Sequence, residues 1–176
     1  FSLLAHNPDA LDQFDNSTEA LFKDSYGNLW CGSQSGELFV YDRKLRLQHV
    51  FPDKQRSCGF DYARAFSFCE DSKGRLWIGT KGEGLYLLEL KKYAANLDKA
   101  HFTHFTQNEL HNEFYDIIED SQHRIWFASF GGGLSLLLEK NKQISFLHYN
   151  QFLNPFCPFS IEYGRCLLED KQGKLW

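Results

Sequence analysis

The sequence predicts an all-β protein, and three observations support this fold class. Aromatic residues make up 16% of the 176-residue chain, and flat rings pack well on the pleated surface of strands. Short apolar segments alternate with turn signals that contain Asp and Gly. One such turn motif recurs four times at nearly constant spacing. A regular repeat of this kind is typical of proteins built from identical structural units.

The recurring motif begins with an apolar residue, continues through an Asp-containing turn and ends in Leu-Trp or Ile-Trp. The tryptophans that end its four copies lie 47, 49 and 50 residues apart. That period suits one four-stranded blade of a β-propeller. The four copies are Phe22–Trp30, Cys69–Trp77, Ile118–Trp126 and Leu168–Trp176.

Each part of the repeat has a predicted role. The apolar segment before the motif forms a first strand, and the motif's Asp accepts hydrogen bonds from backbone N–H groups two residues on. Glycine supplies a positive φ in three of the turns, but His123 takes that position in the third copy. The Trp begins a second strand and should lie between neighbouring sheets. A third strand starts eight residues after each Trp, and a fourth, outer strand carries a recurring His.

The chain is predicted to hold about three whole blades plus partial blades at both ends. Leu4–His6 would be the last strand of a preceding blade. Such a piece cannot close into a ring, and open sheet edges are avoided in native propellers. We therefore expect a fragment of a longer chain, or self-association of two copies. The predicted units of this single propeller fragment are about 1–10 (partial), 18–51, 62–106, 113–149 and 161–176 (partial).

Composition and charge narrow the range of partners. Hydrophobic residues make up 43% and charged residues 24%, as in an ordinary soluble domain. The net charge of -4 offers no basic face for nucleic acid. No apolar run is long enough to cross a bilayer. We expect neither partner for this segment.

No metal or cofactor is expected. The five cysteines include no C-x-x-C pair, and Cys69 occupies an apolar position of the first strand, where it should be a small buried hydrophobe. The recurring histidines would lie on outer strands of different blades, too far apart to share one ion. They are therefore expected to be structural: His6, His49, His104 and His148.

The chain carries no recognisable catalytic motif, so no enzymatic activity is expected of it. Each repeated Asp is explained better by turn formation than by catalysis or calcium binding, and each Trp better by packing between blades than by sugar stacking. A propeller-type lyase, working with a His and a Glu on one face of the ring, remains an alternative by analogy alone.

Strand direction predicts where a ligand would bind. The loops after the second and fourth strands of a blade emerge on the same face, and binding residues concentrate on loops held by a rigid scaffold. Aromatic rings there could stack on sugars, while Arg and Asp could bind hydroxyl or acidic groups. The candidate ligand-binding residues are Arg56, Asp61, Tyr62, Arg64, His111, Asn112, Tyr115, Glu162, Tyr163 and Arg165, with Phe156, Gln34, Lys81 and Phe130 nearby.

The motifs resemble the two-component regulator propeller repeat, E-D-x-x-G-x-L-W-I-G-T followed by G-G-L and an aromatic residue. The second copy, Glu70–Thr80 with Gly84–Tyr86, fits this pattern almost throughout. The departures are few: Cys31 replaces an aliphatic residue, Ala128 and His123 each replace a glycine, and Gly36–Leu38 reads G-E-L.

The resemblance implies the role of a parent protein. In that family, two seven-bladed propellers typically precede an immunoglobulin-like domain, a transmembrane helix and a histidine kinase. Hybrid sensors of this kind in Bacteroidetes commonly detect oligosaccharides. The resemblance therefore implies a periplasmic, carbohydrate-sensing segment of a sensor histidine kinase anchored in the inner membrane, with an oligosaccharide or other small ligand as partner. A protein-interaction scaffold that uses the same face is the main alternative.

Overall fold

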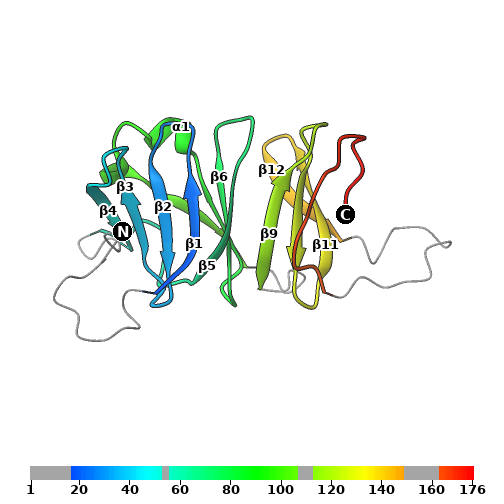
Figure 1. The fold of residues 1–176 in the computed structure, drawn as a ribbon, viewed down its shortest axis with the longest axis horizontal. Coiled ribbons are helices and arrows are strands. Elements are labelled where there is room, and N and C mark those ends of the chain that lie inside the picture. Colours follow the sequence, from blue (N-terminus) through cyan, green and yellow to red (C-terminus); the bar gives the residue numbers. More distant parts are fainter. Residues whose placement is uncertain (1–16, 53–55, 107–112, 149–162) are drawn as a thin grey trace.

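Three four-stranded antiparallel sheets make up most of the structure, a computed structural model that describes residues 17–52, 56–106, 113–148 and 163–176. Figure 1 shows the sheets side by side. The first sheet contains β1 (Thr18–Lys23), β2 (Leu29–Ser33), β3 (Leu38–Tyr41) and β4 (Leu47–Phe51). The second sheet contains β5 (Ala65–Glu70), β6 (Leu76–Thr80), β7 (Leu85–Leu88) and β8 (Phe102–Phe105). The third sheet contains β9 (Phe114–Glu119), β10 (Ile125–Ser129), β11 (Gly133–Lys140) and β12 (Gln143–His148).

Each sheet is a meander in which every strand pairs with the next one along the chain. The first strands lie together, since β5 is in contact with β1 on one side and β9 on the other. This arrangement confirms the all-β class and the blades of a propeller. The strand expected at Leu4–His6 lies outside the described residues.

The repeated Asp organises the turn between the first and second strands of each blade. The Asp71 carboxylate accepts from the backbone N–H groups of Lys73 and Arg75, each at 3.0 Å. The predicted bond two residues on is therefore confirmed here. The sequence did not reveal that the same carboxylate also accepts from the Trp77 indole Nε1 at 3.0 Å. The other copies repeat this indole bond at 2.9, 2.8 and 2.9 Å, in the pairs Asp24–Trp30, Asp120–Trp126 and Asp170–Trp176.

The bonded indoles form the packing between sheets. Trp30 and Trp77 are fully buried. Trp30 belongs to one buried cluster with Ile78 and Tyr86 of the second sheet, and the rings of Trp77 and of Phe127 in the third sheet lie 5.6 Å apart. Their predicted place between neighbouring sheets is confirmed. Trp176 differs, with 65% of its surface exposed, because nothing in the described part of the chain covers its outer side.

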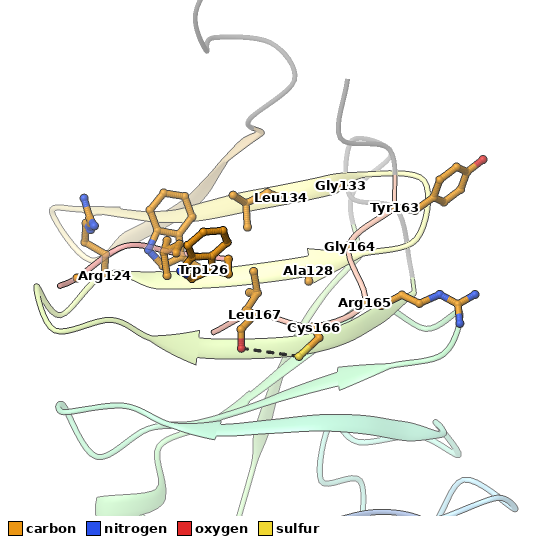
Figure 2. A pocket seen from close by; sticks show the side chains of 13 residues that line it. Arg124, Trp126, Ala128, Gly133, Leu134, Tyr163, Gly164, Arg165, Cys166 and Leu167 are labelled. Atoms are coloured by element: carbon orange, nitrogen blue, oxygen red, sulfur yellow. Dashed lines mark hydrogen bonds between the residues drawn. The ribbon is translucent and has the colours of Figure 1, made fainter. Parts of the chain in front are cut away.

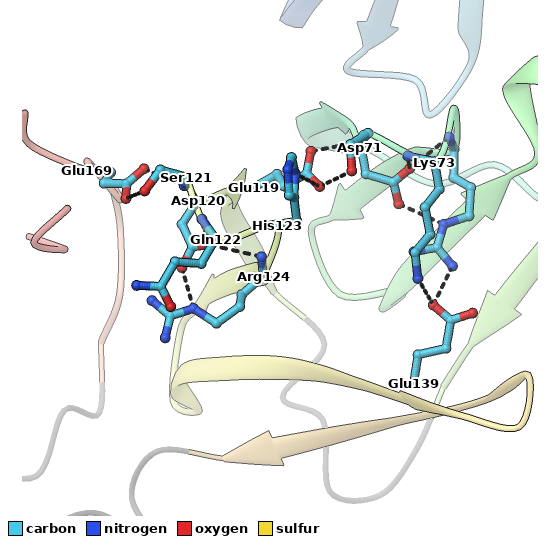
Figure 3. Close-up of polar contacts among 12 residues, drawn as sticks. Asp71, Lys73, Glu119, Asp120, Ser121, Gln122, His123, Arg124, Glu139 and Glu169 are labelled. Carbon is cyan, nitrogen blue, oxygen red and sulfur yellow. Dashed lines mark hydrogen bonds and ion pairs between the residues drawn. The ribbon is translucent and has the colours of Figure 1, made fainter.

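A second repeated contact joins each blade to the next. The Ser after the turn Asp donates its N–H and its hydroxyl to a Glu at the end of the next blade's first strand, as Figure 3 shows for two of the three pairs. We call this contact the Glu–Ser clasp. Its backbone bonds measure 2.6, 2.7 and 2.7 Å in the pairs Ser25–Glu70, Ser72–Glu119 and Ser121–Glu169. The motif letters E-D-S therefore encode one contact within a blade and one between blades.

A short helical insertion departs from the all-β expectation. The connection from β7 to β8 contains α1 (Leu90–Tyr93) and a 3-10 turn at Leu97–Lys99. Leu90 and Ala100 are fully buried in the cluster between the first two sheets, so the insertion adds apolar contacts to that seam. Cys69 is 9% exposed, which confirms it as a buried hydrophobe, and burial raises the pKa of its thiol to about 12.

The recurring histidines each contact a different partner. His49 Nδ1 lies 3.1 Å from the carboxylate of Asp98, His104 Nε2 lies 2.5 Å from the carbonyl of Glu83, and His148 Nδ1 lies 2.9 Å from the hydroxyl of Ser135. His6 lies outside the described residues. Within the described ranges, no three His, Cys, Asp or Glu side chains are grouped as metal ligands would be.

We expect Asp71→Ala to lower the free energy of unfolding by about 3 kcal/mol. The substitution leaves the buried Trp77 indole and the Nε of the buried Arg75 without their acceptor, and an unsatisfied buried polar group costs about 1–3 kcal/mol. Urea denaturation measures the change. Asp170→Ala is the matched control, because its indole partner Trp176 is exposed and water can replace the carboxylate. Equal losses in the two variants would contradict this account.

We expect His123→Gly to raise the free energy of unfolding by about 1 kcal/mol. The structure gives His123 a φ of 61°, a left-handed conformation that costs a residue with a Cβ about 1–2 kcal/mol. The side chain is 73% exposed, and its contact with Glu119 is a surface pair of little worth. Gln122→Gly in the same turn is the control and should destabilise. A lower unfolding midpoint for His123→Gly would overturn the assigned turn geometry.

Candidate functional site

One face of the blades carries repeat positions at which every copy has a different side chain. The motif itself is nearly the same in all four copies, but three positions around it vary completely. We call the surface they form the loop face. The first position lies thirteen residues before the Trp and is occupied by Ser17, Arg64, Glu113 and Tyr163. The second lies eleven residues before the Trp and is occupied by Glu19, Phe66, Tyr115 and Arg165. The third lies four residues after the Trp and is occupied by Gln34, Lys81 and Phe130.

Backbone hydrogen bonds fix these positions against one another. Within a blade, the residue four positions after the Trp donates its backbone N–H. The acceptor is the carbonyl of the residue thirteen positions before the same Trp. This bond measures 2.9 Å in each of the three blades, in the pairs Gln34–Ser17, Lys81–Arg64 and Phe130–Glu113. Isolated bridges then continue across the seams, joining Lys81 to Glu113 and Phe130 to Tyr163. Main-chain contacts therefore hold two of the three positions of the loop face in the same way in every blade.

Four aromatic rings form a continuous row across two seams. The ring centroids of Phe66 and Tyr115 lie 5.6 Å apart, those of Tyr115 and Phe130 lie 6.4 Å apart, and those of Phe130 and Tyr163 lie 4.7 Å apart. We call these four residues the aromatic row. Phe130 is 43% exposed and Tyr163 is 59% exposed, so ring surface at this end of the row is accessible to a ligand.

Three cationic groups lie over the rings of the row. The Arg64 guanidinium carbon and the Lys81 Nζ lie 5.7 and 5.6 Å from the Phe66 centroid, and the Arg165 guanidinium carbon lies 5.7 Å from the Tyr115 centroid. A cation within about 6 Å of a ring face is attracted by the ring's quadrupole. Arg64 also forms an ion pair with Glu19 of the preceding blade. The row and its cations thus combine apolar faces with donors of hydrogen bonds.

Tyr115 stands at the centre of this arrangement. Its hydroxyl donates to the carboxylate of Glu113 at 3.1 Å. Reduced contact with water and the hydrogen bond to Glu113 raise the pKa of Tyr115, while the positive charge of Arg165 opposes the rise. The phenol therefore stays protonated at neutral pH, with its O–H donated to Glu113 and its oxygen able to accept a hydrogen bond.

The structure brings together part of the predicted site. Arg64, Tyr115, Tyr163 and Arg165 lie in one network, together with Lys81 and Phe130. Asp61 and Tyr62 are exposed in the loop before β5, but no contact joins their side chains to the row. Arg56 instead donates to the carbonyl of Ala100 in the β7–β8 connection, at 3.0 Å. The remaining candidates lie outside the described residues: His111, Asn112, Phe156 and Glu162.

Sequence reasoning missed four members of the loop face, of which Ser17 accepts the backbone N–H of Gln34. Phe66 lies under two cations, Glu19 pairs with Arg64, and Glu113 accepts from Tyr115. A signal for them existed, because they occupy the same repeat positions as the predicted Tyr115, Arg165 and Arg64. Comparing equivalent positions among the copies would have identified the whole set.

A groove of about 540 Å³ lies beside the end of the row, between β10–β11 and the segment Tyr163–Trp176. Figure 2 shows Tyr163 and Arg165 at one end of this groove, projecting outward, and Arg124 at the other end. Apolar side chains, among them Leu134 and Leu167, line the space between. Tyr163 and Arg165 are thus accessible both from the loop face and from the groove.

The sheets, their shared seams and the repeated turn define a β-propeller. Residues 59–82 and 108–131 match the model of the two component regulator propeller. The chain therefore carries repeats of this family, as the motifs of the second and third copies indicated. No curated protein matches the chain.

Solved structures with related folds come from several bacteria. The extracellular domain of a protein from B. thetaiotaomicron, named as a hybrid two component system, superposes with a TM-score of 0.65 at 23% identity and covers 92% of this chain. PorZ, described as a surface component of the type-IX secretion system of Porphyromonas gingivalis, gives 0.62 at 16% identity over 92% of the chain. Virginiamycin B lyase from Staphylococcus aureus gives 0.60 at 11% identity over 95% of the chain.

At these identities the similarity establishes the fold alone. The chain spans 20% of the B. thetaiotaomicron domain, 23% of PorZ and 50% of the lyase. It therefore corresponds to a part of each of these proteins. Among the helices that the structure describes, none is long and apolar enough to cross a bilayer.

Proposed function

We propose that this chain is part of an extracytoplasmic, ligand-sensing propeller of a two-component regulatory protein, and that its loop face binds an oligosaccharide. The family match and the extracellular domain from B. thetaiotaomicron support the regulatory role and the location outside the cytoplasm. The parent is a sensor histidine kinase anchored in the inner membrane, which places this segment in the periplasm.

The observation that carries the binding role is the contrast between constant and varied repeat positions. Positions that build the fold keep the same chemistry in every blade, as the four Asp–Trp pairs do. The positions of the loop face differ in every blade, although the same backbone bonds hold them. Variation of this kind is expected where side chains serve recognition and folding places no demand on them.

The chemistry of the loop face suits a sugar chain. Aromatic rings bury large apolar areas and can stack on the C–H faces of pyranose rings. Arg64 and Arg165 present planar donors, and Tyr115 presents a phenol, beside those rings. Because the row crosses two seams, it can contact several consecutive sugar units at once. It therefore suits an oligosaccharide better than a monosaccharide.

The proposal predicts saturable binding of an oligosaccharide to the purified protein. A glycan array identifies the saccharide, and isothermal titration calorimetry gives its dissociation constant. Tyr163→Ala and Phe130→Ala should each weaken binding by about tenfold, which corresponds to ~1.4 kcal/mol, because each removes exposed ring surface. Tyr26→Ala is the matched control, since this ring is 42% exposed in a turn that belongs to none of the loop-face positions.

Three outcomes would contradict the proposal. If no saccharide binds while a protein partner is held through the same residues, the face serves as an interaction scaffold. If an oligosaccharide is consumed with formation of an unsaturated product, the lyase alternative is correct. Unchanged affinity in both aromatic variants would place the binding site elsewhere on the molecule.

A further inference from the structure

Two cations of the loop face have no acidic partner among the described residues. The Lys81 side chain lies over Phe66, and the Arg165 side chain lies over Tyr115. Both residues are exposed, and neither forms an ion pair within the described ranges. Arg64, by contrast, is paired with Glu19. Lys81 and Arg165 therefore keep donors available for a ligand.

Three carboxylates of the loop face and the neighbouring strand are already engaged. Glu19 is held by Arg64, and Glu113 accepts the hydroxyl of Tyr115 at 3.1 Å. Asp116 accepts from the backbone N–H groups of Ile117 and Leu167, at 2.9 and 2.7 Å. These carboxylates are held by other donors, so the charged groups of Lys81 and Arg165 remain available to a ligand, although the whole chain has a net charge of -4.

We infer that the ligand of the loop face is an acidic oligosaccharide, whose carboxylate or sulfate groups are bound by Lys81 and Arg165. This inference rests on the proposed function and adds the chemical class of the saccharide. A guanidinium can bind a carboxylate or sulfate through two parallel hydrogen bonds, and an ammonium binds it as a point charge. The aromatic faces contact the sugar rings while the cations bind their charged substituents.

The spacing of the two cations favours a polymer with repeated charge. The Lys81 side chain lies over the Phe66 ring, and the Arg165 side chain lies over the Tyr115 ring. The centroids of these two neighbouring rings are 5.6 Å apart. A chain that stacks on the exposed rings of Phe130 and Tyr163 and continues along the row passes Arg165 and then Lys81, so acidic substituents on successive units can reach both cations. A neutral chain makes the same stacking contacts but leaves both cations hydrated, so it gains no charge-assisted bond.

The test compares acidic with neutral oligosaccharides on the purified protein. An array of uronic acid-containing, sulfated and neutral oligosaccharides gives the preference, and calorimetry on the best acidic and best neutral probes gives the affinities. We expect acidic probes to bind at least about tenfold more tightly, since hydrogen bonds to charged groups contribute about 1.5–3 kcal/mol. We also expect binding to weaken between about 0.05 and 0.5 M salt, because screening acts on exposed charges.

Single substitutions assign the effect to the two cations. Lys81→Gln and Arg165→Gln should each reduce affinity for the acidic probe by about tenfold and reduce affinity for the neutral probe by a smaller factor, because a sugar hydroxyl loses no charge–charge contact. Lys44→Gln is the control, because it removes one exposed positive charge from the β3–β4 turn, outside the loop face. Thermal unfolding of each variant checks that the fold is intact.

The outcomes separate this inference from the proposed function. Equal binding of acidic and neutral probes, or unchanged affinity for the acidic probe in both glutamine variants, overturns the inferred charge selection and leaves saccharide sensing in place. Failure of every saccharide to bind overturns the proposed function, and the inference with it.

Discussion

The hydrogen bond from each tryptophan indole to the turn aspartate is the contact on which the rest of the structure depends. It ties the start of the second strand to the turn that precedes it, six residues earlier in the chain. It also satisfies the only polar atom of a large apolar side chain, which can then be buried completely between sheets. A phenylalanine would fill the space but could not hold the turn. An aspartate without the indole would cap the turn but would leave the seam unfilled.

The blades are joined by polar contacts at one end and apolar packing in the middle. Each Glu–Ser clasp lies where two turns meet, and the indoles and aromatic rings fill the seam beyond it. Figure 3 shows a further link between the second and third blades, where Lys73 and Arg75 both bind Glu139 at 2.6 and 3.1 Å. These contacts are directional, so they set the angle between neighbouring sheets. Packing alone would leave that angle less defined.

Much of the fold could be predicted because four copies of one motif report the same local structure. The register of the strands follows from the constant distance between Trp and the third strand. The helix at Leu90–Tyr93 could not be predicted, since a four-residue segment has no helical periodicity to detect and depends on burial of Leu90. The clasp was hidden for a different reason, because Glu70 and Ser25 are 45 residues apart and only the packing of blades brings them together.

The site was predicted in part, and the limits are physical as well. Strand direction placed Arg64, Tyr115, Tyr163 and Arg165 on one face, and the structure brings these four side chains into one network. Strand direction could not show that Phe66 lies under two cations, since that contact depends on side-chain direction at the start of β5. Nor could it exclude Arg56, whose partner Ala100 belongs to the unexpected helical insertion.

The backbone bonds of the loop face have an evolutionary consequence. Because main-chain atoms hold these positions, a mutation there can exchange charge, size or aromaticity with little effect on folding. The two positions in each blade that these bonds hold can then change without loss of the backbone contacts, and blades with new combinations can be duplicated or exchanged as units. A propeller built in this way can acquire a new specificity through a few point mutations, without loss of the scaffold that presents it.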